Sequence, residues 1–397
     1  MYFGGVASEK QRGAKKASSL LSPRRVGDLN RSRVLRALAD HGPLSRSDLA
    51  RAAGVTRATM GTIVQGLIDS GLLEEHEAVL QGAIGKPARP VWFATGAGLA
   101  VAASITSDEV SACLVDAVGE AHGHKQVPIK DPESARSVAD AVVKAVRQAR
   151  EEGDPVGVGV AVPGVCDTQT GEVLGSGQVP GARGRRIFES VSEMTGLPVY
   201  VDNDSRAQAL AERWFGAGRG RDTFASLQTG NGLGVGLVLD GVIIRSRNGT
   251  AGEVGHTCVV PNGDRCSCGL RGCWETIATV PWLRREARAA RLPGAQTMTC
   301  HKLVALAADS KPAAELLDRY AVNLSIGIAN LNQILSLETF ILHGDVVGGG
   351  DEFRNRLERH ARDRSLTRLS LVYSEFDDAT LLGAGAVVLS ETFRLVG

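Results

Sequence analysis

The chain has 397 residues, of which 43% are hydrophobic and 48 are glycine, a composition typical of a globular protein with many tight turns. Its length predicts two to three domains. No run approaches the roughly 20 apolar residues of a membrane span, and the N-terminus lacks a signal-peptide core, so we expect a cytoplasmic protein without membrane contact. The net charge of +1 is uneven: residues 1–100 hold 14 Lys and Arg against 8 Asp and Glu, and the rest hold 31 against 36. This asymmetry indicates a polyanionic partner for the N-terminal part.

The first quarter of the chain, residues 1–94, is predicted to begin with a basic arm followed by three short helices. Residues 1–27 are basic and show no apolar periodicity, so we expect a flexible arm. From Asn30 onward apolar residues recur at helical spacing. Ser45 is placed to cap a second helix and Thr56 a third, which Gly71 ends. The result is a helix, helix, turn, helix pattern.

An extended segment follows the third helix and is rich in glycine and proline over residues 82–90, which predicts a two-stranded wing. We therefore assign residues 28–94 to a winged helix-turn-helix domain. In such domains the second helix of the motif enters the major groove with its N-terminal side chains, and a basic wing contacts the neighbouring minor groove. The residues predicted to contact double-stranded DNA are Thr56, Arg57, Thr59, Met60, Thr62, Lys86 and Arg89.

The same three-helix bundle with a hairpin also occurs in proteins that bind other proteins, and this alternative stays open from the pattern alone. The positive charge of the N-terminal part and the small polar side chains at the start of the third helix favour DNA. Arg57 is the strongest candidate for reading a base edge.

Residues 97–397 alternate between apolar runs and helical stretches separated by glycines, as in a mixed α/β domain. Strands are predicted at 100–105, 112–116, 156–162, 199–201, 224–227, 234–239 and 340–343. Helices are predicted near 134–151, 186–195, 205–215, 275–290, 312–336 and 351–363. The sequence shows no internal repeat in residue identity, but the strand clusters near 100–162 and 224–343 are candidates for two related halves.

Four potential metal ligands lie within the loop 256–273, in the pattern H-x9-C-x-C-x4-C. Imidazole and thiolate ligands with no spare position are typical of a closed, tetrahedral structural Zn²⁺. The predicted ligands are His256, Cys266, Cys268 and Cys273. The alternative is a surface histidine beside three free cysteines. The other four cysteines have no such spacing and are expected to be packing residues.

Carboxylate and amide side chains stand at the ends of several predicted elements. Asp202, Asn203 and Asp204 follow a strand, Glu253 follows a glycine-rich loop, and Glu275 follows the last cysteine of the zinc loop. A fold that converges these loops would bind a polyhydroxylated ligand, because each hydroxyl both donates and accepts hydrogen bonds. Taken singly, each of these residues is equally compatible with a turn or a helix cap.

These motifs together resemble the ROK family, which contains repressors and sugar kinases, from about Asn30 to Gly385. The resemblance is carried by Val162-Pro163-Gly164, by Val201-Asp202-Asn203-Asp204 with Glu212-Arg213-Trp214-Phe215-Gly216, by Gly252-Glu253-Val254-Gly255-His256 and by the stretch from Cys266 to Glu275. It implies an α/β fold in which the winged helix precedes a two-lobed, actin-like domain of the sugar-kinase and ribonuclease H type. It also implies a sugar in the cleft between the lobes and zinc on the four ligands above.

Carried over position by position, the family's sugar-contacting residues match positions in this sequence, and Asp204 matches the general base of the kinases. His256 would serve both zinc and sugar, one through each ring nitrogen. The ligand-binding residues that the resemblance implies are Gly164, Gln178, Asn203, Asp204, Glu253, His256 and Glu275. Gln178 and Ala182 stand where the family often has Asn and Trp, which predicts a wider pocket or a different sugar.

The nucleotide-binding motifs depart from the family's kinases. Where these have Asp-x-Gly-Gly-Thr, this chain has Ser-Ile-Thr-Ser-Asp at 104–108; Gly-Thr-Gly becomes Gly-Asn-Gly at 230–232; and the adenosine-side Gly-Gly becomes His343-Gly344-Asp345. Phosphoryl transfer depends on such loops. We therefore expect a regulator that binds an operator and responds to a sugar, most simply a repressor of carbohydrate metabolism genes, with no enzymatic activity and with a homodimeric or homotetrameric assembly.

Two alternatives remain at this stage. One is an ATP-dependent, glucokinase-like sugar kinase that carries a regulatory DNA-binding head, with Asp204 as its base. The other is a regulator whose sugar site has degenerated and which responds to a phosphorylated metabolite or to a protein partner.

Overall fold

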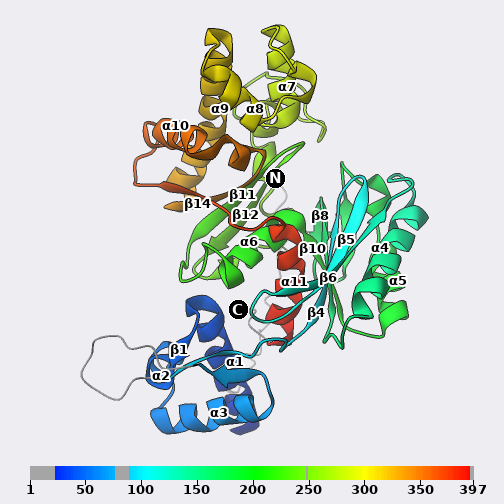
Figure 1. The fold of residues 1–397 in the computed structure, drawn as a ribbon, viewed down its shortest axis with the longest axis vertical. Helices are drawn as coiled ribbons and strands as arrows, with labels where there is room; N and C mark the ends of the chain where they lie inside the picture. The colour runs from blue at the N-terminus through cyan, green and yellow to red at the C-terminus, as the bar shows by residue number, and fades with distance from the viewer. Residues whose placement is uncertain (1–22, 77–88, 247–248, 394–397) are drawn as a thin grey trace, which may run out of the picture.

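The computed structural model describes residues 23–76, 89–246 and 249–393, and Figure 1 shows a small N-terminal domain below two larger lobes. The small domain has the predicted order. Its elements are α1 (Pro23–His41), β1 (Leu44–Ser45), α2 (Arg46–Ala53), α3 (Arg57–Asp69), β2 (Leu73–Glu75) and β3 (Pro90–Phe93). The strands form a sheet in the order β1-β3-β2. Helix α1 begins at Pro23, earlier than the predicted start and inside the segment expected to be a flexible arm.

Both predicted helix caps of the small domain are confirmed. The Ser45 hydroxyl accepts a hydrogen bond from the Asp48 amide at 3.1 Å, and the Thr56 hydroxyl accepts one from the Thr59 amide at 3.2 Å. Such caps satisfy amides that have no partner inside the helix. The Ser45 cap fixes the start of α2, and the Thr56 cap fixes the start of α3 at the turn that follows the C-cap Gly54 of α2. Strands β2 and β3 are the two arms of the expected wing, and its tip lies outside the described residues.

The first lobe is built on a five-stranded sheet in the order β10-β7-β4-β5-β6. Its strands are β4 (Ala100–Ile105), β5 (Glu109–Val115), β6 (Ala121–Pro128), β7 (Val158–Val162) and β10 (Val199–Asn203). Helices α4 (Ala135–Arg150) and α5 (Arg186–Thr195) pack on its outer side (Figure 1). A two-stranded ribbon of β8 (Val165–Asp167) and β9 (Glu172–Gly175) follows β7.

The second lobe repeats this topology in the order β13-β12-β11-β14-β15. Its elements are β11 (Phe224–Thr229), β12 (Leu233–Leu239), β13 (Val242–Ile243), α7 (Val280–Ala289), α8 (Cys300–Ala307), α9 (Lys311–Leu335), β14 (Thr339–Gly344), α10 (Gly350–Arg362) and β15 (Ser370–Tyr373). In each sheet three strands form an antiparallel meander, and two more add in parallel beside the first. The expectation of two related halves is therefore confirmed.

Two helices lie between the sheets, as Figure 1 shows: α6 (Asp204–Phe215) and α11 (Ala379–Thr392). They pack on each other, while α6 also covers β11 and β12 and α11 covers β4 and β7. Glycine permits this close approach: a Cβ added to Gly383 would lie 1.9 Å from the carbonyl oxygen of Ala207, and one added to Gly159 would lie 1.9 Å from that of Ala384. The two lobes therefore meet through this pair of central helices.

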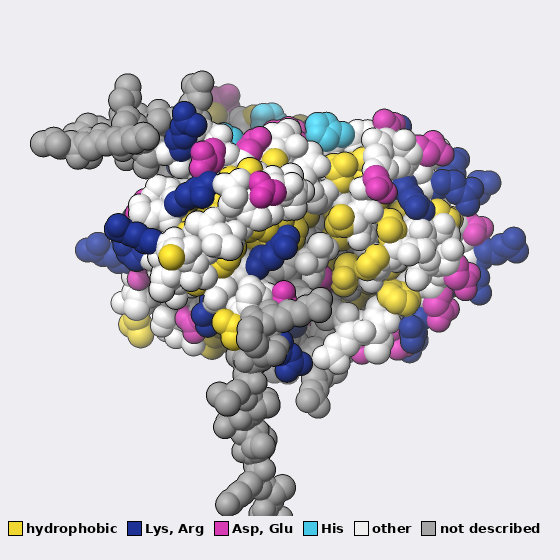
Figure 2. All heavy atoms as spheres, turned by 90° about the horizontal axis from the view of Figure 1, so that it is seen from below, with side chains coloured by type: hydrophobic (Ala, Val, Ile, Leu, Met, Phe, Trp, Pro, Cys, Tyr) yellow, Lys and Arg dark blue, Asp and Glu magenta, His cyan; other side chains and the backbone are white. Residues whose placement is uncertain are grey.

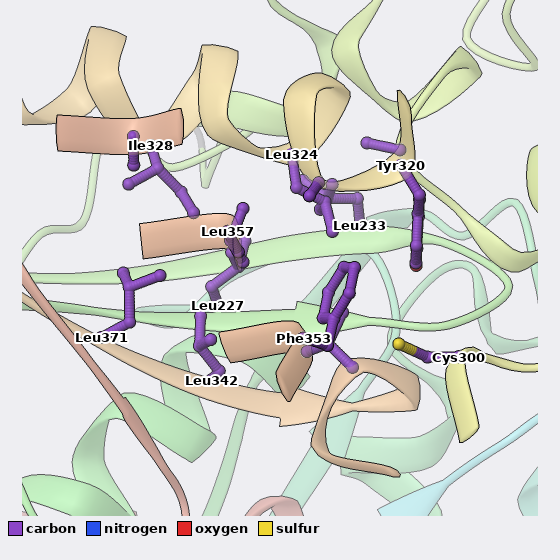
Figure 3. Close-up of a cluster of buried hydrophobic side chains, with 14 of the residues drawn as sticks. Leu227, Leu233, Cys300, Tyr320, Leu324, Ile328, Leu342, Phe353, Leu357 and Leu371 are labelled. Carbon is purple, nitrogen blue, oxygen red and sulfur yellow. The ribbon is translucent and has the colours of Figure 1, made fainter. Parts of the chain in front are cut away.

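The core of the second lobe lies between its sheet and helices α9 and α10, as Figure 3 shows. Tyr320 and Leu324 of α9 approach Phe353 and Leu357 of α10 over the strand residue Leu342, and all five are fully buried. Apolar burial of this kind contributes roughly 25 cal/mol per Å² and fixes the platform that carries the loops described below. Among the described helices, none combines the length and apolarity that crossing a membrane requires.

Candidate functional sites

A cleft of about 610 Å³ opens between the lobes, beside the N-terminal end of α6. It is lined from both sheets, from the loops at 163–164, 177–178 and 251–256, and from the N-terminus of α11. All of the predicted ligand-binding residues line this one cleft: Gly164, Gln178, Asn203, Asp204, Glu253, His256 and Glu275. Residues as far apart as 164 and 275 in the sequence therefore share one site.

Asn203 organises the floor of the cleft. Its side-chain oxygen caps α6 by accepting from the amides of Ser205 at 3.0 Å and Arg206 at 3.1 Å. Its Nδ2 donates to the carbonyl oxygen of Gly164 at 2.9 Å and to Oδ1 of Asp204 at 3.0 Å. Asn203 thus connects the loop after β7 to the start of α6. Both polar atoms of its side chain are engaged within the protein, so its role in these contacts is to position the site.

Asp204 has its two carboxyl oxygens in different roles. Oδ1 accepts from the Ser205 amide at 2.8 Å and from Asn203, whereas no described residue is hydrogen-bonded to Oδ2. Burial raises the pKa of Asp204 to about 6, and the nearby Glu253 adds to the rise while Arg206 opposes it. Burial likewise raises the pKa of Glu253. Because only Oδ1 is engaged by described residues, Oδ2 is suited to accept a hydrogen bond from a ligand hydroxyl.

A buried ion-pair network lies directly behind these residues. Asp202, 2% exposed, accepts from Nε of Arg206 at 2.6 Å and from Nη2 of Arg245 at 2.9 Å. Although burial alone would raise it, the two guanidinium groups hold the pKa of Asp202 below its usual value. Arg206 also donates to the carbonyl oxygens of Gly249 at 3.1 Å and Cys166 at 3.3 Å. The network therefore joins strand β8 and the loop around Gly249 to strand β10 and the start of α6.

The turn between β4 and β5, at 106–108, occupies the position of the lost Gly-Gly-Thr motif. The Thr106 hydroxyl accepts from the amides of Asp108 at 3.4 Å and Glu109 at 3.2 Å, and the Thr106 amide donates to the Glu109 carbonyl at 2.9 Å. Backbone donors of this kind bind phosphate in nucleotide loops, but here they bind the turn itself. Asp108 adds an exposed carboxylate to the cleft wall.

The other two altered nucleotide motifs differ from each other. The turn at 230–232 lines the cleft and is closed by a hydrogen bond from the Gly230 amide to the Gly232 carbonyl at 3.0 Å. His343, in contrast, is 4% exposed and is not part of the cleft lining. Its Nε2 lies 2.9 Å from the Ser226 hydroxyl, and burial lowers its pKa to about 4. His343 therefore belongs to the interior of the second lobe.

The cleft also contains residues that sequence reasoning missed. Gln208 of α6 donates to Gln228 of β11 at 3.0 Å and to Thr380 of α11 at 2.8 Å, and Asp378 caps α11 through the Leu381 amide at 2.8 Å. All four line the cleft with no neighbouring motif to mark them, because they meet only when α6, β11 and α11 come together. The described lining carries five carboxylates and no Lys or Arg: Asp108, Asp204, Glu253, Glu275 and Asp378.

The four predicted metal ligands converge at the edge of the cleft, with their ligand atoms all within 4.8 Å of one another. The Sγ atoms of Cys268 and Cys273 are 3.7 Å apart, and Nδ1 of His256 is 3.5 Å from Sγ of Cys266. Tetrahedral zinc with bonds of about 2.3 Å to sulfur and 2.0–2.1 Å to nitrogen requires about 3.8 Å and 3.6 Å for these edges. The residues therefore fit a tetrahedral metal ion.

His256 connects the metal site to the cleft. Its Nδ1 faces the cysteines, while its Nε2 lies 3.9 Å from Oε2 of Glu253 on the cleft side. Glu275 likewise lies between the metal-ligand cluster and the cleft. Its Oε1 lies 3.8 Å from Sγ of Cys266, and its Oε2 accepts a hydrogen bond from the amide of the cleft residue Leu233 at 3.4 Å. A metal on Nδ1 would fix the ring orientation and leave Nε2 directed at the cleft.

On the winged helix, the predicted DNA-contacting residues of α3 divide into two groups. Arg57, Thr56 and Thr62 are exposed, and Thr59 is half-buried and engaged with Thr56, whose hydroxyl lies 2.9 Å from its own. The prediction for Met60 is wrong: its side chain is 1% exposed and belongs to the domain core.

Of the two wing residues, Arg89 is exposed just before β3, and Lys86 lies outside the described residues. Gln65 is also exposed, one turn beyond Thr62, and its Nε2 donates to Oδ1 of Asp69 at 2.8 Å. Seen from the winged-helix end, Figure 2 shows Lys and Arg side chains dispersed among acidic ones rather than gathered into one patch.

Two family models match the chain. The model of the MarR family matches residues 28–82, and the model of the ROK family matches residues 101–391. These ranges correspond to the winged helix and to the two-lobed domain. The second match spans well over half of the sequence.

Relatives match either the whole chain or only its two-lobed part. The putative xylose repressor of Caldicellulosiruptor sp. (strain Rt8B.4) is 26% identical, covering 92% of this chain and 96% of its own. The glucokinase of Halalkalibacterium halodurans is 32% identical, covering 64% of this chain and 82% of its own. The crystal structure of a ROK family transcriptional regulator, a homologue of the E. coli Mlc protein, superposes with a TM-score of 0.76 and 25% identity, covering 93% and 97% of the two chains. The chain belongs to the ROK family.

Proposed function

We propose that this protein is a DNA-binding transcriptional regulator, most simply a repressor of carbohydrate metabolism genes, whose operator affinity changes when a sugar enters the cleft. The observation that carries this proposal is that one cleft combines the predicted ligand-binding residues with altered nucleotide-binding turns. All seven predicted ligand-binding residues line this cleft, while the turns at 106–108 and 230–232, which replace nucleotide-binding motifs, are closed by hydrogen bonds of their own. Two relatives named as xylose repressors, one of them putative, cover 92% and 91% of this chain, whereas the glucokinase covers 64% of it.

The same cleft favours an uncharged or positively charged sugar over a phosphorylated one. Five carboxylates line it, and the described lining residues include no Lys or Arg that would pair with a phosphate. Two unit charges of like sign about 6 Å apart repel by on the order of 3 kcal/mol at an effective dielectric constant of 20. Asp108 stands where the kinases of the family have a phosphate-binding threonine, so it opposes a phosphate at that end of the cleft.

The exposed Arg57 and Thr62 of α3 are the residues we assign to the major groove, with Arg89 at the base of the wing. Operator half-sites about one DNA turn apart require two winged helices, so we propose a homodimer or homotetramer. The four-ligand loop holds a structural Zn²⁺, which supplies rigidity to the cleft edge rather than chemistry. Size-exclusion chromatography with light scattering and metal analysis test these two assignments.

Fluorescence anisotropy with labelled fragments from upstream of the protein's own gene tests the function. We expect a salt-sensitive complex that unrelated DNA competes for poorly, and a change in its Kd with at least one unphosphorylated sugar of a hexose, pentose and amino-sugar panel. Glu253→Ala should abolish the sugar response and keep the complex. A panel with no effect on any specific complex would sink the proposal.

The competing function is an ATP-dependent sugar kinase, and it draws on one observation: Asp204, at the kinases' base position, has a pKa of about 6. A coupled ADP-release assay over the same sugar panel separates the two functions. We expect no turnover above the rate of Asp204→Asn. Sugar-dependent ADP release that Asp204→Asn abolishes would reverse our assignment.

A further inference from the structure

Helix α6 has its two ends in two different sites. Asn203 and Asp204 at its start line the cleft between the lobes. Arg213 and Trp214 in its last turn contact the winged helix. Twelve residues make a rod of about 18 Å, and a helix packed on both flanks by β12 and α11 moves as one body. The helix therefore forms a direct physical link between ligand site and DNA-binding domain.

The polar part of the distal contact is an ion pair. Nε and Nη2 of Arg213 donate to Oδ1 of Asp40, near the end of α1, at 3.1 and 2.6 Å, and their side chains are 12% and 20% exposed. Arg36 supports the same carboxylate at 3.6 Å and donates to the Gly241 carbonyl at 3.3 Å. The Asp40 carbonyl in turn accepts from the Gly220 amide at 2.6 Å. Charge-assisted hydrogen bonds of this kind fix an angle as well as a distance.

The apolar part of the contact is an aromatic stack. Phe93 of strand β3 stacks on Trp214 with ring centroids 5.9 Å apart and on Phe393 at 5.6 Å. Trp214 donates from its indole nitrogen to the Ser390 hydroxyl of α11 at 3.1 Å, and Arg219 lies over the ring of Trp92 at 5.2 Å. The winged-helix core and the ends of α6 and α11 form one buried cluster. The DNA-binding domain is thus seated on these helices.

A second connection runs beside the helix. Arg245 donates to Oδ2 of Asp202, the residue just before the α6 cap, at 2.9 Å. The same arginine lines the small cavity at the winged-helix contact together with Arg36, Asp40 and Arg213. A movement of the cap residue Asn203 therefore reaches the winged-helix contact both along α6 and through Arg245.

We propose that α6 couples the cleft to the orientation of the winged helix, and that the Arg213–Asp40 pair is the joint through which it acts. The inference rests on the proposed function for its biological meaning, but the mechanical coupling stands on contacts alone. A ligand shifts an equilibrium only by its differential affinity for two arrangements. Ligand hydroxyls that pull on the start of α6 would supply that difference, and Arg213 and Asp40 are positioning residues that transmit it.

A double-mutant cycle on the full-length protein tests the coupling without any sugar. Asn203→Ala removes the cap in the cleft, and hydrogen–deuterium exchange of the α1 segment 34–41 reports on the winged-helix contact. We expect Asn203→Ala to speed this exchange at least about fivefold, the lower range of allosteric coupling, and less than about twofold once Arg213→Gln is present. Segment 138–149 of α4, which packs on the far side of the first sheet, should be unchanged throughout.

Arg356→Gln is the matched control, because Arg356 pairs with Asp318 at 3.2 Å in the second lobe, away from both sites. In that background the fivefold effect of Asn203→Ala should persist. Equal effects of Asn203→Ala with and without Arg213→Gln, or no effect of Asn203→Ala on segment 34–41, would overturn the inference.

A second readout uses D-xylose and D-glucose as probes. If either sugar raises the melting temperature of the wild type, Arg213→Gln should show the same thermal shift. The sugar-induced change in its promoter Kd should be smaller than that of the wild type by a factor of at least about five. An unaltered promoter response in Arg213→Gln contradicts the coupling. If a whole sugar panel failed to bind the wild type, the proposed function would fail, and the exchange cycle would still decide the coupling.

Discussion

Replacing Asp204 by asparagine should stabilise the protein while it removes sugar binding. Asn keeps an oxygen to accept the amide of Ser205 and the side chain of Asn203, the contacts that Oδ1 makes now. It also removes a carboxyl whose ionisation is disfavoured, because burial and the neighbouring Glu253 raise its pKa to about 6 against an opposing effect of Arg206. Binding sites often retain such groups at a cost in stability.

The sign and the size of the effect on the free energy of unfolding follow from the linkage between proton binding and folding. Because the folded state holds this proton up to a higher pH than the unfolded state, stability falls as pH rises from about 4 to 7. A rise from 3.8 to about 6 corresponds to at most about 3 kcal/mol at pH 7.5, and to about half of that at pH 5. Asp204→Asn should recover this free energy, and its advantage should shrink as the pH is lowered.

Urea unfolding followed by tryptophan fluorescence at pH 7.5 and pH 5 measures the effect, and one of the four tryptophans, Trp214, lies on the same helix. Asp108→Asn is the control, since Asp108 is an exposed carboxyl on the same cleft and its replacement should change stability little. A loss of stability in Asp204→Asn at pH 7.5, or a gain independent of pH, would refute the reasoning.

Three further predictions address the other sites. Cys268→Ser should lose the single zinc per chain in elemental analysis, with α1 exchange unchanged; retention of one zinc would contradict the four-ligand assignment. Arg57→Ala should weaken operator binding by roughly 1–3 kcal/mol with the sugar-induced thermal shift intact, so equal losses of both would count against separate sites. Met60→Ala should destabilise the winged helix by about 2–5 kcal/mol in thermal unfolding, whereas Gln65→Ala at the exposed face should not; the reverse pattern would return Met60 to the DNA surface.

The elements predicted from sequence were those with a clear period or a clear cap. The winged helix followed from Ser45, Thr56 and the apolar spacing of α1. Helix α11 was missed because it is buried nearly all round between the sheets, so it has no polar face to set a period. Strand β6 was missed for the opposite reason: as an edge strand it is mostly polar and shows no apolar run.

The residues of the candidate sites also divide into those with a local sequence signal and those without one. The spacing of His256 and the three cysteines predicted the zinc loop, and the motifs shared with the ROK family marked Asp204 and Glu253 as ligand-binding residues. Gln208 and Thr380, which meet across the cleft floor, depend on the packing of α6 against α11 and had no local signal. The error at Met60 was avoidable, since Met60, Val64 and Leu67 follow the core period of α3.

The most direct test is the Kd of the full-length protein for DNA from upstream of its own gene, with and without unphosphorylated sugars, in wild type and Glu253→Ala. A specific complex whose Kd changes at least about fivefold with one sugar, and only in the wild type, is the predicted result. No specific complex, or a sugar response that survives in Glu253→Ala, would contradict a sugar-responsive regulator that reads its effector in this cleft.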